Sequence, residues 1–169
     1  YLGFANNEKL KQHMIEAINA YGIGAGSSQL MAGHIETHER LEKKLATFFN
    51  KKSALVFSSG YHANLAIASA LINKNTIIFQ DKLNHASLID AAKLSKGKLV
   101  RYQHRDLTHL KSLLEKYKGN ELVVMTDGVF SMDGDRAPLM EITKLCRTYN
   151  ALLIVDDAHG IGVLGENGA

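Results

Sequence analysis

Short apolar segments alternate with amphipathic helices through most of this chain, and that alternation constrains its fold more than any other feature. Apolar, β-branched runs predict strands, and apolar side chains at helical spacing predict helices. The expected strands cover residues 54–57, 76–79, 99–102, 122–126 and 152–155. The expected helices between them cover residues 61–72, 86–94, 107–117 and 139–149. Because such units favour parallel strands, we expect an α/β fold with a mainly parallel sheet covered by helices on both faces.

The first part of the sequence has a different pattern, in which two helices flank a glycine-rich loop. Asn7 is a favourable helix N-cap, and Gly22 is a favourable helix terminator. Helical spacing predicts helices over residues 7–21 and 37–49, with the glycine-rich loop over residues 22–28. We therefore expect residues 1–50 to form an N-terminal helical segment and residues 51–169 to form part of a larger α/β domain.

Composition excludes several classes of function. The 169 residues carry a net charge of +3, which is too small an excess to indicate a nucleic-acid partner. No apolar run reaches membrane-spanning length and no secretory signal is visible, so we expect no membrane partner. Cys146 is the only cysteine, which rules out an internal disulfide and indicates a cytoplasmic location. Its place within an expected helix predicts a buried thiol rather than a nucleophile.

The stretch 152–160 carries the strongest chemical signal. An apolar strand ends there in two consecutive carboxylates, Asp156 and Asp157, and His159 follows closely. Open α/β sheets bind their ligands at the carboxyl ends of the strands. A carboxylate held in such a dry place needs a cationic partner, and the protonated ring nitrogen of a pyridine is one. This stretch therefore suggests a site for pyridoxal phosphate (PLP).

Further candidate residues follow other expected strands. Gly60 and Tyr61 lie at a strand-to-helix turn, where free N–H groups and the helix dipole can bind a phosphate, although an ordinary turn has the same pattern. His85 could stack on a flat ring or transfer a proton. Alternatively, His85 lies in a helix-capping segment in which Asn84 or Ser87 is the cap.

Two loops near these residues allow more than one interpretation. Ser131 could donate a hydrogen bond to a ring oxygen or a phosphate. Asp133 and Asp135 suggest a calcium or magnesium loop, but the other ligand positions of such a loop are missing, so we expect a plain turn and no metal. Residues 160–165 match the dinucleotide pattern G-x-G-x-x-G, but they do not lie directly between a strand and a helix, so we do not assign that function.

The candidate residues are modest signals individually and stronger together. They all lie at or just after the carboxyl ends of expected strands, so a parallel sheet would bring them to one edge. These residues are Gly60, His85, Ser131, Asp156 and His159.

Six sequence motifs resemble those of the α-oxoamine synthases, a family of PLP-dependent enzymes. Together they extend over essentially the whole chain: residues 1–3, 22–28, 57–64, 84–87, 127–134 and 156–160. The resemblance implies the large domain of PLP-dependent transferase fold type I, of which residues 1–169 are a fragment. It also implies a homodimer, because this fold builds its site at the subunit interface.

The resemblance also implies a cofactor, PLP, and a role for each matching residue. Gly60 and Tyr61 hold the phosphate end, and Asp156 pairs with the protonated ring nitrogen so that the ring can take up negative charge. His159 and Ser131 form hydrogen bonds with the phenolic oxygen of the ring.

His85 has two implied roles, because it stacks on the pyridine ring and also contacts the substrate. The expected catalytic residues are thus His85, Asp156 and His159, with no metal ion.

Within the family, residues 157–163 and 135–139 are most similar to the branch that serves biotin biosynthesis. That branch implies a condensation of L-alanine with a pimeloyl thioester, carried by CoA or a carrier protein, with loss of CO₂. One alternative is 2-amino-3-ketobutyrate CoA ligase, which uses glycine and acetyl-CoA. The other is a catalytically silent PLP- or nucleotide-binding module, if the chain is complete.

Two departures from the family pattern matter. The Schiff-base lysine of the family lies in a Thr-x-x-Lys-like motif downstream of the Asp-x-x-His motif. Within residues 1–169, nothing downstream of the Asp-x-x-His motif matches the Thr-x-x-Lys-like motif. We therefore expect that the C-terminal part with this lysine is absent, and that the fragment alone binds PLP but is inactive. Gln29 stands where the family often has a basic residue, so no substrate role is assigned to it.

Overall fold

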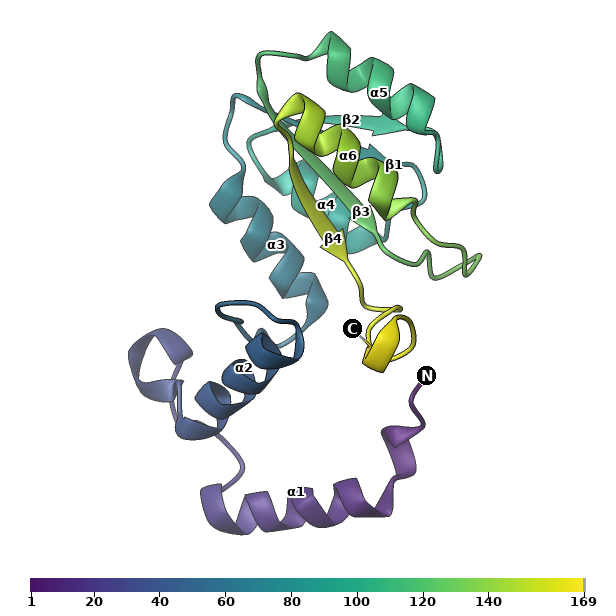
Figure 1. Cartoon of the computed structure of the whole chain (residues 1–169). Coiled ribbons are helices and arrows are strands. Elements are labelled where there is room, and N and C mark those ends of the chain that lie inside the picture. Colours follow the sequence, from purple (N-terminus) through teal and green to yellow (C-terminus); the bar gives the residue numbers. More distant parts are fainter. Residues whose placement is uncertain (169) are drawn as a thin grey trace. The chain divides into compact units, whose positions relative to one another are not determined.

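The computed structural model describes residues 1–168, which form two compact units (Figure 1). The first unit comprises Tyr1–Val56 together with the residues from Gly162 onward, and the second comprises Phe57–Ile161. Each unit is described by itself below.

The second unit is built on a four-stranded parallel sheet in the order β2-β1-β3-β4. The strands are β1 (Thr76–Asp81), β2 (Lys98–Tyr102), β3 (Glu121–Asp127) and β4 (Leu152–Asp156). The expected α/β fold with parallel strands is thereby confirmed. Because β1 and β3 form the middle of the sheet, their side chains are buried on both faces, as the continuous apolar sequence of these strands predicts.

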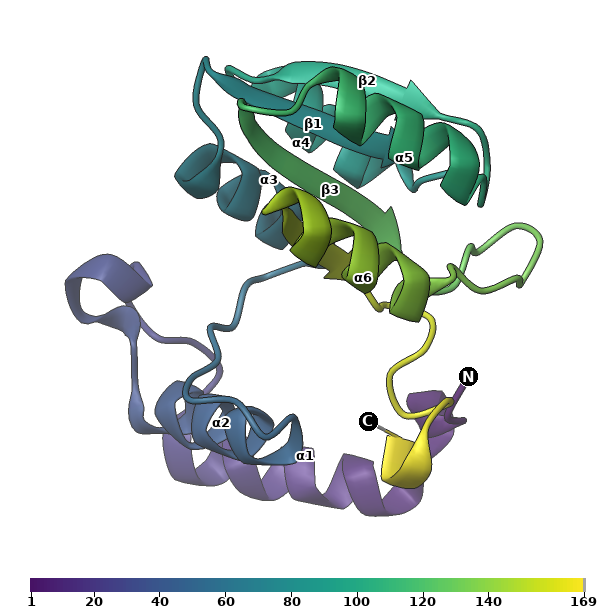
Figure 2. The same cartoon turned by 45° about the horizontal axis from the view of Figure 1, so that its top comes forward.

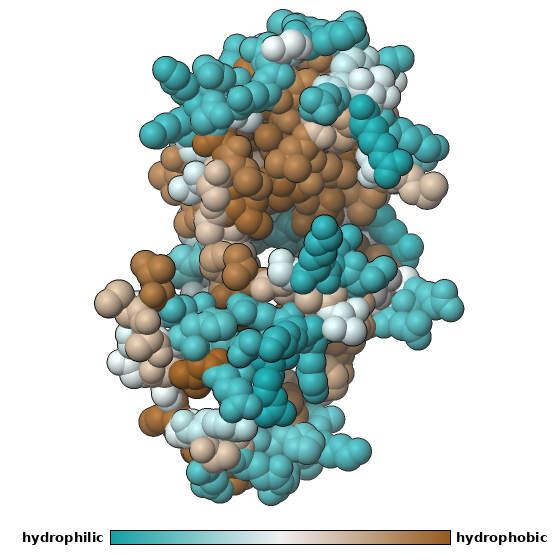
Figure 3. Space-filling view, turned by 60° about the vertical axis from the view of Figure 1, so that its left-hand side comes forward, coloured by the Kyte–Doolittle hydropathy of each residue, from teal (hydrophilic) through white to brown (hydrophobic). Residues whose placement is uncertain are grey.

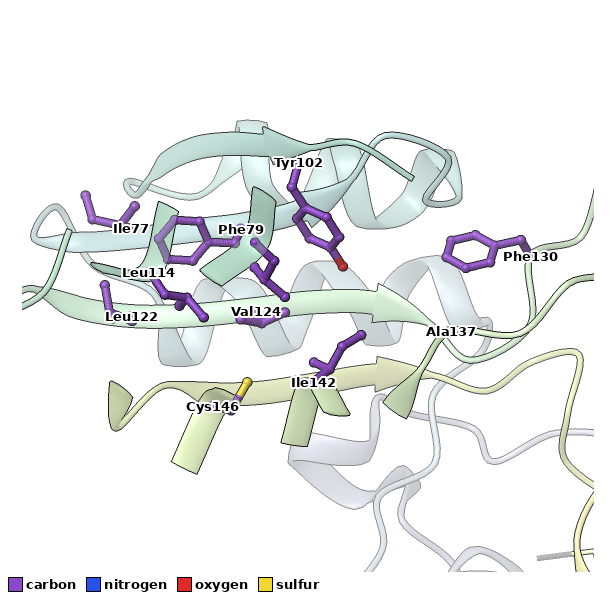
Figure 4. Close-up of a cluster of buried hydrophobic side chains, with 11 residues drawn as sticks. Ile77, Phe79, Tyr102, Leu114, Leu122, Val124, Phe130, Ala137, Ile142 and Cys146 are labelled. Atoms are coloured by element: carbon purple, nitrogen blue, oxygen red, sulfur yellow. The ribbon is translucent and has the colours of Figure 1, made fainter. Parts of the chain in front are cut away.

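Helices cover both faces of this sheet (Figure 2). They are α3 (Gly60–Leu71), α4 (Ala86–Leu94), α5 (Leu107–Lys116) and α6 (Leu139–Tyr149). Strand side chains alternate between the two layers. Ile78 packs with residues of α3 and α4, whereas Ile77 and Phe79 pack with residues of α5 and α6 (Figure 4).

The only cysteine of the sequence lies in the core on the side of the sheet covered by α5 and α6. Cys146 is buried in this core, and burial raises the pKa of its thiol to about 11. A thiol with so high a pKa is not an activated nucleophile, which agrees with the expectation from sequence.

One predicted strand is wrong. Residues 54–57 have no regular structure, although their sequence is apolar. A strand requires a neighbouring strand for its backbone groups, and the N–H of Val56 instead donates to the Glu42 carboxylate at 3.0 Å. The alternation of strands and helices therefore begins with α3 and β1.

In the first unit, two helices flank the glycine-rich loop, as expected. They are α1 (Glu8–Tyr21) and α2 (Glu36–Phe48). Asn7 is the N-cap of α1, since its side chain accepts from the N–H of Leu10 at 3.0 Å, and Gly22 ends that helix with a φ of 79°. Sequence did not predict the short 3₁₀ segments Phe4–Asn6 and Glu166–Gly168 or the short π-helix Gln29–Gly33.

Apolar side chains also reach the surface of the chain. Leu152 and Val155 of the edge strand β4 are 46% and 37% exposed, and Figure 3 shows a broad hydrophobic area on the second unit. Within residues 1–168, every helix is too short or too polar to cross a lipid bilayer.

Candidate functional site

A cavity of about 230 Å³ opens at the carboxyl edge of the sheet, where β3 and β4 end and α3 and α4 begin. All of its lining residues belong to the second unit: Gly60, Tyr61, His85, Ser87, Asp127, Asp156, Ala158 and His159. A larger cavity of about 400 Å³ lies in the first unit, but its walls are mainly apolar and include no carboxylate. The smaller cavity has the charged groups that chemistry requires, so it is the candidate site.

The structure brings together most of the side chains that sequence singled out. Gly60, Tyr61, His85, Asp156 and His159 all line this one cavity. Ser131 is not among the lining residues, and it lies exposed in the turn that follows Phe130. Its assignment to the cofactor stays a prediction.

The first turn of α3 forms one wall of the cavity. The N-cap is Ser59, whose hydroxyl accepts from the N–H of His62 at 3.2 Å. Gly60 and Tyr61 follow it, and the first N–H groups of a helix have no acceptor within the helix. The expected anion site thus rests on a helix N-terminus, although the strand expected before it is absent.

His85 lies at the start of α4 and is itself the N-cap. Its Nδ1 accepts from the N–H of Ser87 at 3.2 Å, so the expectation that Asn84 or Ser87 caps this helix is wrong. The backbone N–H of His85 donates to Asp127 at 2.7 Å. These contacts hold the imidazole at the cavity and connect α4 to the end of β3.

Asp156 is the last residue of β4, and two donors fix its carboxylate. Oδ2 accepts from Nδ2 of Asn64 at 2.7 Å, and Oδ1 accepts from the N–H of Ala158 at 3.1 Å. A carboxylate with donors on both oxygens is held in one orientation at the edge of the sheet.

Two more carboxylates lie close to Asp156. Asp127 is its partner across the β3–β4 ladder, and burial raises the pKa of Asp127, with a further rise from the Asp156 charge. Burial, followed by the Asp156 charge, also raises the pKa of Asp157. Gly128 and Gly160 lie against Asp157, and a Cβ at either position would approach Oδ1 of Asp157 to within 2.7 Å. Glycine at both positions therefore makes room for that side chain.

The loop after β3 is held by an ion cluster. Asp135 accepts from His104 Nε2 at 2.8 Å and from Arg105 at 2.9 Å, and these partners lower its pKa although burial opposes the shift. Asp133 and Gly134 lie in a turn, where Gly134 has a φ of 73°. Residues 1–168 contain no group of His, Cys, Asp and Glu side chains that could hold a metal ion.

The glycine pattern of residues 160–165 does not form a dinucleotide-binding turn. β4 ends at Asp156, and the described residues after Gly165 form only the short 3₁₀ turn Glu166–Gly168. A dinucleotide site needs the glycines between a strand and a full helix, whose N-terminus binds the pyrophosphate.

Sequence reasoning gave Asn64 and Asp127 no role at the site, and it considered Ser87 only as a helix cap. Asn64 and Ser87 form hydrogen bonds with Asp156 and His85, and Asp127 holds the backbone of His85. One signal was visible: Asn64 is a polar residue in an otherwise apolar stretch of α3, one turn after Gly60. A polar side chain buried among apolar ones lowers the stability of the fold unless it has a hydrogen-bond partner.

Comparison with known proteins places the chain in a family. The model of the family described as aminotransferase class I and II matches residues 1–169. The chain belongs to this family. Among its curated relatives, 8-amino-7-oxononanoate synthases from Geobacter sulfurreducens and Citrifermentans bemidjiense are each 50% identical over 99% of this chain. The chain spans 43% of the length of each of these two relatives.

Solved structures that are similar to this chain agree with this placement. Serine palmitoyltransferase from Sphingomonas wittichii has a TM-score of 0.95 at 33% identity, over 99% of this chain and 42% of its own. An 8-amino-7-oxononanoate synthase from Francisella tularensis has a TM-score of 0.82 at 38% identity, over 99% and 46%. A serine palmitoyltransferase solved with PLP has a TM-score of 0.94. The resemblance to α-oxoamine synthases and the fold expected from it are thereby confirmed.

Proposed function

We propose that this chain is the N-terminal part of an 8-amino-7-oxononanoate synthase, a PLP-dependent acyltransferase of biotin biosynthesis. The reaction joins L-alanine to pimeloyl-CoA or a pimeloyl carrier protein and gives 8-amino-7-oxononanoate, the free thiol and CO₂. One observation carries the proposal: a single cavity combines the Asp156 carboxylate, two imidazoles and the N-terminus of α3. The names of relatives with 50% identity support the choice of reaction.

The residues at this cavity fit PLP. The oriented carboxylate of Asp156 suits a protonated pyridine nitrogen, and the first N–H groups of α3 suit a phosphate. Both lie at the wall of the same cavity of about 230 Å³. When bound, PLP supplies an electron sink that stabilises negative charge on the α-carbon of an amino acid.

The other side chains at the site have distinct proposed tasks. Gly60 and Tyr61 bind the phosphate end, and Tyr61 is held by a hydrogen bond from its hydroxyl to Asp90 at 3.2 Å. His85 presents its imidazole to the flat ring and to the substrate. His159 and Ser131 contact the phenolic oxygen of the cofactor.

Further features of the proposal follow from the family. A lysine beyond residue 169 would supply the amine that holds PLP. The enzyme is a homodimer and acts in the cytoplasm. The substrates are small molecules, and neither nucleic acid nor membrane is a partner.

A turnover assay tests the proposal. The gene product is mixed with PLP and with either L-alanine plus pimeloyl-CoA or glycine plus acetyl-CoA, and released CoA is measured together with product mass. We expect L-alanine and pimeloyl-CoA to be the preferred pair. Preference for glycine and acetyl-CoA would assign the chain to 2-amino-3-ketobutyrate CoA ligase, and PLP binding without any turnover would indicate a silent module.

Two neighbouring carboxylates provide a matched comparison for the site. Asp156→Asn removes one carboxylate from the cavity wall and should lower turnover by a factor of about 100 or more, since the ring nitrogen loses its charged partner. Asp157→Asn removes a charge from the next residue, which is not a lining residue of the cavity. That variant should retain most of the activity, and an equal loss in both would argue against the role of Asp156.

A further inference from the structure

Asn64 is a buried amide that points from α3 toward the candidate site. Its residue exposure is 6%, and its side-chain nitrogen has an acceptor for each of its two protons. Nδ2 lies 2.7 Å from Oδ2 of Asp156 and 2.9 Å from Oγ of Ser87. The opposite amide orientation would place the carbonyl oxygen against a carboxylate, so the network fixes which end carries the nitrogen.

Ser87 extends this contact to His85. Because its Oγ accepts from Asn64, its own proton is available for Nδ1 of His85, which lies 2.7 Å away. The backbone N–H of Ser87 points to the same ring nitrogen at 3.2 Å. A nitrogen that accepts from these donors carries no proton, so the proton of a neutral His85 ring lies on Nε2.

We propose that Asn64 is a positioning residue, which holds Asp156 directly and His85 through Ser87 by means of the two protons of one amide group. This inference rests on the proposed function, since Asp156 and His85 are there the groups that face the cofactor ring. Asn64 connects them although they come from β4 and from the start of α4.

The chemistry of the side chain explains why an asparagine stands here. The position needs two donors on one atom, without a charge, between a carboxylate and a hydroxyl. Leucine has a similar size and no donor, whereas aspartate would place a second carboxylate next to Asp156. Serine is too short to reach both partners.

The effect on Asp156 is testable with a cofactor analogue. The gene product and its Asn64→Leu variant are titrated with PLP and with 1-deaza-PLP, in which a CH group replaces the ring nitrogen, and binding is followed by absorbance. Wild type should prefer PLP, because only PLP has the nitrogen that pairs with Asp156. In Asn64→Leu this preference should fall by about tenfold or more, since a hydrogen bond to a charged group is lost.

Asn84→Leu is the matched control. Asn84 is as buried as Asn64, at 5%, but its amide bonds to the backbone of Met125 and Asp127 rather than to Asp156. This variant should weaken the binding of PLP and of 1-deaza-PLP to the same extent, so the preference for PLP should remain. Asn64→Ser repeats the test with a smaller side chain if the leucine variant does not fold.

Two results would overturn the inference while the proposed function stands. One is a folded Asn64 variant with the wild-type preference for PLP. The other is ¹⁵N NMR of the protein without cofactor in which Nδ1 of a neutral His85 carries the proton. Failure of the proposed function is a separate result, because it is read from wild type alone, which would then not bind PLP or would not turn over L-alanine with pimeloyl-CoA.

Discussion

At the scale of single residues, His104 connects the end of β1 to the loop after β3, outside the cavity. Nδ1 lies 2.9 Å from Asp81 and Nε2 lies 2.8 Å from Asp135, and the ring makes a T-shaped contact with Phe130. Burial alone would lower the pKa of His104, but hydrogen bonds with both carboxylates raise it above its usual value. Because Asp135 belongs to the loop that also carries Ser131, this imidazole holds that loop to the end of β2.

The raised pKa of His104 makes its contribution to stability depend on pH. A histidine whose pKa is higher in the folded state stabilises the protein fully below the unfolded value of about 6.5, and the effect is lost as pH rises through the folded value. His104→Gln should therefore reduce the free energy of unfolding more at pH 6 than at pH 9. Urea unfolding at both pH values measures this difference.

The control for this measurement is His13→Gln, which changes an exposed histidine of α1. It should produce a smaller change at pH 6 than His104→Gln does. A loss of stability in His104→Gln that is equal at both pH values would mean that the ring acts through packing alone.

Sequence predicted the charged residues of the site better than it predicted their connections. Asp156 and His85 were visible because strand ends and helix starts are local signals. The bonds of Asn64 join residues 23 and 92 positions apart in sequence, so they depend on how α3 packs against α4 and β4. Ser131 was also singled out from a local motif, but in the structure it lies exposed and does not line the cavity.

At the scale of secondary-structure elements, caps define where the helices begin. The carboxylate of Asp106 accepts from the N–H of His109 at 2.8 Å and thereby caps α5. Asp106→Ala should lower the free energy of unfolding by about 1 kcal/mol, because a donor at the helix start loses its acceptor. Chemical unfolding with Asp106→Asn as the capping-competent control checks this value, and an equal loss in both variants would exclude the cap as the cause.

Most elements followed from local patterns, and the exception has a physical reason. The expected helices 86–94 and 139–149 have the observed bounds of α4 and α6, because apolar spacing and flanking residues agree there. Residues 54–57 have the composition of a strand, but composition cannot supply a partner for the backbone. A helix forms its backbone hydrogen bonds within the element, whereas a strand forms them with residues elsewhere in the chain.

At the scale of the whole chain, the sheet order in the second unit has a consequence for protein synthesis. β2 pairs with β1, β3 then pairs with the other side of β1, and β4 pairs with β3. Each strand after β1 therefore meets a partner that left the ribosome before it. Since domains fold as the chain is made from its N-terminus, this sheet can grow outward without rearrangement.

Pulsed hydrogen exchange on arrested nascent chains would follow this growth directly. Amides of β1 should become protected once β3 has emerged, while β4 is still inside the ribosome. Protection of β1 that begins only after β4 emerges would instead mean that the sheet forms in a single late step. If the order holds, the buried middle of the sheet is complete before the carboxylate at the end of β4 reaches it.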